Sequence, residues 1–268
     1  MRELQPILTA HLFAPLNDEL VSLLRSLLPG EWNAPTVAGA WTVKDVAGHL
    51  LDTKLRRLSM HRDGHTPMLS DDAFANGLAA FINGMNREGV AWMSRISPAI
   101  LTEMHATYGA QMAAFFETLD PYAKARIGVS WAGEEESANW FDIARELTEQ
   151  WHHQQQIRDA AGRTPLYDRF LAPVIDTFVR ALPYTYRDVD APEGTAITLR
   201  ITDVWTLVRR DSQWVLYSGE APSPATDITL RGEIAWRLFT KQRVDPQARV
   251  EGEARYARPA FGMTSIVA

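Results

Sequence analysis

The stretch TVKDVAGHLLDTKLRRL, residues 42–58, carries the clearest helix signal in the chain. Thr42 followed three residues later by Asp45 has the pattern of a capping box, in which the hydroxyl and the carboxylate each accept a backbone N–H. The apolar residues that follow recur at helical spacing, and His49 shares their stripe three residues after Val46. The stretch therefore predicts a helix that starts at Val43 and brings one histidine to a core.

Further helical patterns lie on both sides of this stretch. A leucine stripe before it ends at Pro29-Gly30, and residues 71–86 are ambiguous because glycines and asparagines interrupt their apolar spacing. Later helices are expected after Ser97, around residues 146–160 with a cap near Ser137 or Asn139 and an end at Gly162, and over residues 171–182 with an end at Pro183. The leucines of the first stripe are Leu16, Leu20, Leu23, Leu24, Leu27 and Leu28.

The sequence pattern changes from helical to strand-like after about residue 190. Residues 195–201, 205–210, 214–217 and 227–232 are short β-branched or alternating segments, and Asp211-Ser212 supplies a turn between two of them. Helical patterns return at residues 233–243 and 257–268. We expect an α+β fold, mainly α, with a bundle of four or more helices followed by a small α+β domain. The predicted domains are residues 1–185 and 186–268, with residues 183–194 as the linker.

Composition excludes several function classes. The net charge is -6 and the sequence pI about 5.7, and no Lys/Arg cluster marks a nucleic-acid surface. A basic signal-peptide flank and a membrane-spanning apolar stretch are not found, which favours a cytoplasmic protein without a membrane partner. Cysteine is absent, so disulfides, thiolate ligands and a cysteine nucleophile are excluded, and any thiol must come as a cosubstrate. The expected partner is a small molecule, and the chain is expected to be a monomer or homodimer.

The stretch ELTEQWHHQQQIRDA, residues 146–160, places two histidines in one predicted helix. On a helical wheel Glu149 and His153 form an i,i+4 pair at the edge of the buried face, whereas His152 points toward solvent or a second packing surface. With His49 they give two imidazoles and a carboxylate, a composition common in catalytic zinc sites that keep a fourth position open.

Plainer interpretations stay open for these residues. His49 alone fits a hydrogen-bonded core histidine, and Glu149 with His153 fits a surface pair. A di-iron bundle needs a second Glu-x-x-His element, which the other histidines do not supply. Gln150 and Gln156 lie within about a turn of the proposed ligands on the inward side and fit groups that support them, while the glutamines between them need no function.

Three segments resemble one known family. Residues 31–52 (EWNAPTVAGAWTVKDVAGHLLD), 148–162 (TEQWHHQQQIRDAAG) and 233–253 (EIAWRLFTKQRVDPQARVEGE) resemble the mycothiol-dependent maleylpyruvate isomerase family, which has a DinB-like bundle and a C-terminal α+β domain. The likeness covers nearly the whole chain and is looser between residues 62 and 135. One departure is Gln242-Arg243, where the family commonly shows Gly-Arg.

The resemblance implies a single divalent metal ion held by His49, Glu149 and His153. Zinc is expected first, and nickel, cobalt or iron also suit two histidines and a glutamate. In the family's reaction the metal stabilises the thiolate of a low-molecular-weight thiol such as mycothiol, which adds to a cis double bond and leaves after rotation. Arg237 and Arg243 are candidate catalytic residues that would bind a substrate carboxylate through a bidentate fork.

These observations favour a metal-dependent cis-trans isomerase or thiol S-transferase acting on a small electrophilic acid. Two alternatives remain at this point. One is a hydrolase that uses a metal-bound hydroxide, and the other is a non-catalytic stress or binding protein in which the metal only joins two helices.

Overall fold

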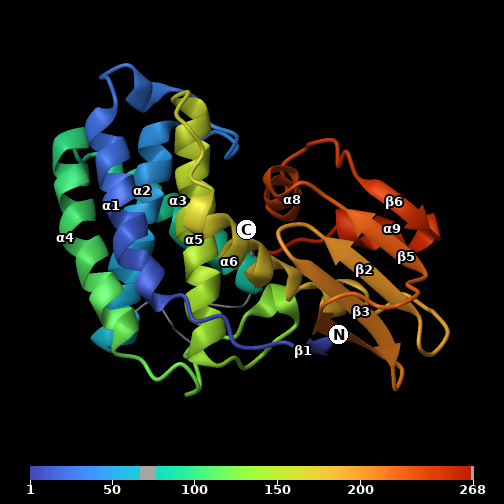
Figure 1. The fold of residues 1–268 in the computed structure, drawn as a ribbon. Helices are drawn as coiled ribbons and strands as arrows, with labels where there is room; N and C mark the ends of the chain where they lie inside the picture. Colours follow the sequence, from blue (N-terminus) through green and yellow to red (C-terminus); the bar gives the residue numbers. More distant parts are fainter. Residues whose placement is uncertain (67–76, 267–268) are drawn as a thin grey trace. The chain divides into compact units, whose positions relative to one another are not determined.

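The computed structural model describes residues 1–66 and 77–266, and it combines helices with one mixed sheet (Figure 1). The predicted α+β class, mainly α, is confirmed. The helices are α1 (Phe13–Ser26), α2 (Val43–Arg57), α3 (Leu78–Met93), α4 (Pro98–Glu117), α5 (Asn139–Ala160), α6 (Asp168–Val179), α7 (Leu182–Thr185), α8 (Gly232–Phe239) and α9 (Ala254–Phe261). The strands are β1 (Arg2–Glu3), β2 (Ala196–Arg200), β3 (Val204–Arg210), β4 (Gln213–Ser218), β5 (Thr226–Thr229) and β6 (Arg249–Gly252).

The chain divides into two compact units. The bundle unit contains residues 8–126 and 149–166, and the sheet unit contains residues 1–7, 127–148 and 167–266. Helix α5 therefore contributes its first part to the sheet unit and its second part, from Glu149, to the bundle unit. The expected domain boundary between residues 185 and 186 stays a prediction, because compact units need not be segments that fold on their own.

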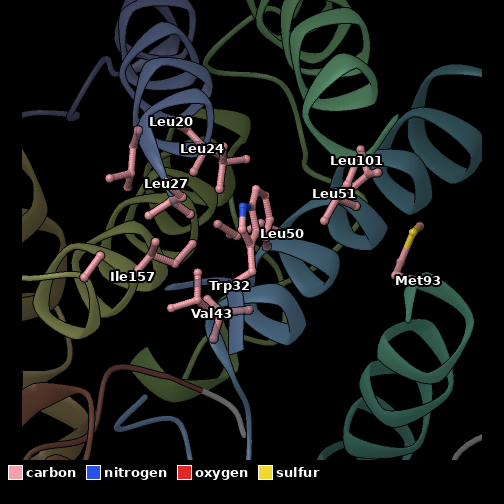
Figure 2. Packing of buried hydrophobic residues seen from close by; sticks show 14 residues of the cluster. Leu20, Leu24, Leu27, Trp32, Val43, Leu50, Leu51, Met93, Leu101 and Ile157 are labelled. Atoms are coloured by element: carbon pink, nitrogen blue, oxygen red, sulfur yellow. The ribbon is translucent and has the colours of Figure 1, made fainter. Parts of the chain in front are cut away.

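In the bundle unit, α1 packs on α4, and α2 packs on both α3 and α4. Figure 2 shows the apolar side chains that meet between them, with Trp32, Leu50 and Ile157 among those labelled. Gly48 lets α2 and α3 approach closely, because a Cβ at this position would lie 2.8 Å from the Cβ of Met93. The buried cluster contains Leu20, Leu23, Leu24, Leu27, Trp32, Val43, Val46, Ala47, Leu50, Leu51, Met93, Leu101, Ile157 and Ala161.

Two expectations about this unit change in detail. Leu28 was expected in the buried stripe, but it is 65% exposed, because α1 ends at Ser26 and Leu27 adopts an extended ψ of 133° that turns the chain away. The ambiguous segment is helical from Leu78 onward, and its residues 71–76 lie outside the described part of the chain.

In the sheet unit, the strands are ordered β1-β4-β3-β2-β5-β6, and every neighbouring pair is antiparallel except β2 with β5. The expected turn between β3 and β4 is confirmed. Asp211 and Ser212 have φ values of 50° and 61°. Positive φ at both turn residues gives a two-residue hairpin whose twist matches the right-handed twist of its strands. Helix α6 packs on α8, α7 on β4, and α9 on β5.

Several boundaries in this unit differ from the expected ones. Helix α6 ends at Val179, and Pro183 lies in the first turn of α7, where its missing N–H has no helical partner to lose. The last helix spans Ala254–Phe261 rather than residues 257–268. The expected linker is not a free segment, since Tyr186 within it is buried and its hydroxyl donates to the carbonyl of Tyr256 at 2.5 Å.

Strands β1 and β6 were not expected from the sequence, because they have only two and four residues and carry no apolar alternation. Among the helices of residues 1–66 and 77–266, none has the length and apolar character to cross a membrane.

Candidate metal centre

His49 is placed by the start of α2. The Thr42 hydroxyl accepts the N–H of Asp45 at 3.3 Å, and the Asp45 carboxylate accepts the N–H of Thr42 at 2.9 Å, which confirms the capping box. The cap fixes where the helix begins and therefore which side chains share a face. His49 consequently lies in the buried face beside Val46 and Leu50, with only 1% of its surface exposed.

Glu149 and His153 come from the second part of α5, one helical turn apart. The Nε2 of His153 lies 3.3 Å from Oε1 of Glu149, as an i,i+4 pair permits. His153 is buried, whereas 23% of the Glu149 side chain is exposed, which makes the carboxylate the most open member of the trio.

The three predicted ligands come together in the bundle unit. The Nε2 of His49 lies 2.9 Å from Oε1 of Glu149, so both imidazoles approach the same carboxylate oxygen. One ligand atom from each residue lies within 4.8 Å of the others, a grouping that could hold a metal ion. The two imidazole rings are 4.7 Å apart and inclined at 74°.

The electrostatics of the trio favour a cation. Burial lowers the pKa of His49, and the neighbouring Glu149 only partly opposes this, so His49 keeps a free ring lone pair at neutral pH. Burial would raise the pKa of Glu149, but the charge of His153 and hydrogen bonds from both histidines outweigh it and hold this pKa well below its usual range. An ionised carboxylate and a neutral imidazole are the protonation states that bind metals.

Gln156 hydrogen-bonds the ring nitrogen of His153 that does not face Glu149. The Nδ1 of His153 lies 2.7 Å from the amide oxygen of Gln156, which can only accept, so Nδ1 carries a proton, and Nε2 is the ring nitrogen that faces Glu149. Gln150 makes a different contact, because its amide Nε2 donates to the Thr53 hydroxyl on α2 at 3.0 Å. Sequence reasoning placed both glutamines near the ligands, and this structure gives a direct hydrogen bond to a proposed ligand for Gln156.

The other side chains of this stretch are more buried than expected. His152 is only 2% exposed, so the expectation that it faces solvent is wrong and the second packing surface is correct. Gln154 is fully buried, and Gln155 accepts the N–H of Leu166 at 2.9 Å. The wheel failed here because it assumes one apolar face, whereas every residue from 151 to 157 is buried.

Arg237 and Arg243 belong to the sheet unit. Arg237 on α8 donates to the amide oxygen of Gln242 at 3.1 Å, and its guanidinium lies 4.4 Å from the centre of the Trp236 ring. Arg243 is exposed in the segment after α8. Directly after α8 the left-handed position is Lys241, with φ 63°, whereas Gln242, which stands at the expected glycine, has no positive φ. Binding of a substrate carboxylate by either arginine stays a prediction.

Trp41 adjoins the trio, and the helical wheels gave no sign of it because it lies before the helix. Its ring centre is 4.9 Å from that of His49 and 6.3 Å from that of His153. The sequence signals were its position next to the capping box at Thr42 and its place in residues 31–52, the first segment that resembles the family.

The donors at this position fit a divalent cation. Two imidazole nitrogens and a carboxylate oxygen match catalytic zinc sites, and the hydrogen bond from His153 to Gln156 is the orientation that ligating histidines commonly have. A partly exposed carboxylate between two buried imidazoles is also a place where an added positive charge is stabilised. The fold and the trio together define a helical-bundle protein with a candidate metal centre.

Comparison with known proteins agrees with this class. The family model described as the mycothiol maleylpyruvate isomerase N-terminal domain matches residues 13–158, more than half of the 268 residues. The chain belongs to the mycothiol-dependent maleylpyruvate isomerase family.

Solved structures support the fold. A crystal structure of the mycothiol-dependent maleylpyruvate isomerase is similar with a TM-score of 0.57 at 14% identity, over 93% of this chain and 95% of that one. A histidine-to-alanine mutant of that isomerase gives a TM-score of 0.50 at 14% identity, over 87% of this chain and 88% of that one. At this identity the likeness concerns the fold alone. A comparison with curated proteins finds no match.

Proposed function

We propose that this protein is a metal-dependent enzyme that uses a low-molecular-weight thiol to isomerise a small electrophilic acid, or to transfer the thiol to it. The observation that carries the proposal is the convergence of His49, Glu149 and His153 in a chain of the mycothiol-dependent maleylpyruvate isomerase family. Mycothiol is the first thiol to consider because the family is named for it.

The residues that would hold the metal are His49 and His153 through Nε2 and Glu149 through its carboxylate. Zinc suits this donor set best, and nickel, cobalt or iron are the alternatives according to availability. A divalent cation bound there would lower the pKa of a thiol and stabilise its thiolate. Burial favours the neutral form of His49 by lowering its pKa, and Gln156 keeps a proton on Nδ1 of His153, so a bound metal would take the place of hydrogen at the two Nε2 atoms that face Glu149.

The chemistry balances without a redox partner. The thiolate sulfur forms a bond to one carbon of a cis double bond conjugated to a carbonyl, and the π electrons move to the carbonyl oxygen. The former double bond is now single and rotates. Return of the electrons restores the double bond in the trans form and expels the thiolate, so the thiol is regenerated. The chain has no cysteine, and the nucleophile therefore comes from outside.

Arg237 and Arg243 are proposed to bind the carboxylate of the acid through their guanidinium forks. The absence of cysteine suits a reducing compartment, which supports a cytoplasmic location. As partners we propose small molecules, with the chain acting as a monomer or homodimer.

The test is turnover of maleylpyruvate by zinc-loaded protein, followed with and without mycothiol. The proposal predicts conversion to the trans isomer only when thiol is present. Hydrolysis of esters or amides in the absence of thiol would contradict the proposal and support the alternative of a hydrolase that uses a metal-bound hydroxide. A zinc-dependent rise in melting temperature, with no response to thiol or electrophile, would replace it by the non-catalytic binding protein.

A further inference from the structure

Trp41 covers the imidazoles of the proposed centre. Its ring is inclined at 40° to that of His49 and at 39° to that of His153, with the ring centres 4.9 Å and 6.3 Å apart. The indole is partly exposed, whereas His49 is buried. Trp41 is therefore a partly exposed aromatic side chain in contact distance of the imidazoles of the proposed centre.

The backbone holds Trp41 in a tight turn. Its carbonyl accepts both the N–H of Thr36 at 3.1 Å and the hydroxyl of Thr36 at 2.7 Å, and its own N–H donates to Ala38 at 3.2 Å. Gly39 supplies the positive φ of 65° that the turn needs. Since Thr42 next to it caps α2, the turn and the helix that carries His49 form one continuous, hydrogen-bonded segment.

The indole N–H of Trp41 is free to donate. Three other tryptophans donate theirs within the protein: Trp151 to Leu166 at 2.8 Å, Trp205 to Asp176 at 3.1 Å and Trp214 to Val189 at 3.0 Å. In the part of the chain that the structure describes, the N–H of Trp41 has no such acceptor, and it is not sealed from solvent. An indole N–H that no protein group uses, next to a candidate centre, is available to donate to a bound ligand.

We propose that Trp41 is a substrate-binding residue whose indole N–H donates a hydrogen bond to an oxygen of the acid substrate. The proposal rests on the proposed function for the class of substrate, a small unsaturated acid. That oxygen belongs to the group conjugated with the double bond, and it gains negative charge when the sulfur adds. A fixed donor is most effective where charge develops, because it needs no reorganisation during the reaction.

The test measures binding of maleate, a small cis-unsaturated dicarboxylate, to zinc-loaded protein by calorimetry in the absence of any thiol. Trp41→Phe keeps an aromatic ring and removes the N–H, and benzothienylalanine at position 41 keeps the bicyclic shape and also lacks the N–H. Trp92→Phe is the matched control, since Trp92 on α3 of the same unit is 53% exposed and outside the trio. Removal of one hydrogen bond to a charged group predicts Kd values about tenfold or more above wild type for both position-41 variants. Zinc stoichiometry is expected to be unchanged.

Three outcomes would overturn the assignment. They are wild-type affinity in both position-41 variants, no maleate binding by wild type, or loss of zinc from the benzothienylalanine variant. The last would make the indole a support for the imidazoles and not a donor to substrate. Because the assay contains no thiol, intact Trp41-dependent binding together with thiol-independent turnover would contradict the proposed function alone.

Discussion

The Nε2 of His49 lies 2.9 Å from Oε1 of Glu149, although the two residues are 100 positions apart in the chain. The contact joins α2 to the second part of α5 within the bundle unit. Without a metal this hydrogen bond satisfies the carboxylate. His153, one turn further along α5, places its Nε2 3.3 Å from the same carboxylate oxygen. A divalent cation would replace a neutral donor by a full positive charge at a position where both imidazoles already converge.

Removing either imidazole is expected to abolish stoichiometric metal binding. His49→Ala and His153→Ala each leave two protein donors, and a two-donor site loses the composition that zinc requires. Metal content of tag-free protein, measured by mass spectrometry after dialysis, gives the result. His65→Ala serves as control because His65 is exposed and outside the trio. Full metal content in both ligand variants would refute the site.

Gln156 is expected to tune metal affinity through His153. Gln156→Leu removes the acceptor of the Nδ1–H hydrogen bond, and loss of such a partner typically weakens metal binding by about 10- to 100-fold. Gln156→Glu keeps an acceptor of the same length and should retain affinity close to wild type. Competition with a zinc-binding dye measures both Kd values, and equal affinity in the Leu and Glu variants would exclude this role.

Because of His105 on α4, we expect the folded protein to lose stability in mild acid. Its Nε2 lies 2.9 Å from the Ala47 carbonyl and its Nδ1 lies 3.0 Å from Nζ of Lys54. Burial, followed by the Lys54 charge, lowers the pKa of His105 well below 6.5. Below about pH 6.5 the unfolded chain binds a proton that the folded chain does not, so the free energy of unfolding falls as pH falls, by at most about 1.4 kcal/mol per pH unit for one histidine.

The variant His105→Gln cannot take up this proton, so its stability should fall less steeply between pH 7 and pH 5.5. Urea unfolding with a chelator present, repeated across this pH range, measures the slope of the free energy of unfolding against pH. Some slope should remain, because burial lowers the pKa of His49 as well. The same slope in the variant and in wild type would show that His105 titrates equally in both states.

Gln154 and Gln155 are adjacent, and we expect opposite effects when each becomes methionine. Both amide atoms of Gln154 are buried without a hydrogen-bond partner in the part of the chain that the structure describes, so Gln154→Met should raise the free energy of unfolding by about 1 kcal/mol or more. Gln155→Met removes the acceptor of the Leu166 N–H and should lower it by about 1 kcal/mol. Thermal melting compares the pair, and a destabilised Gln154→Met would mean that its amide has partners in solution.

Lys241 is expected to cost stability at the end of α8. Its N–H donates to Leu238 and that of Gln242 to Arg237, a Schellman arrangement whose left-handed position usually holds glycine. Because a side chain with φ near 63° is strained, Lys241→Gly should raise the free energy of unfolding by about 1 kcal/mol. Lys241→Ala, which keeps the Cβ, is the control and should give no comparable gain in melting temperature.

Local chemistry explains what could be predicted of the site. The i,i+4 spacing of Glu149 and His153 and the face of His49 follow from helix geometry once each helix is recognised. Their convergence from two helices was an inference, since nothing in one helix reports which neighbour it meets. Trp41 was missed because its relation to the imidazoles depends on a turn that carries no helical period.

The sequence alone determined the elements whose signals are local: the cap of α2 at Thr42, the hairpin turn at Asp211 and Ser212, and the change from helices to strands. Each depends on hydrogen bonds or backbone preferences within a few residues. Tertiary structure alone decided that Gln154 is buried, that Leu28 is exposed, and that His49 and Glu149 share a contact. Those outcomes depend on packing between segments far apart in the chain, where the burial of one residue is set by neighbours that its own surroundings in the sequence do not specify.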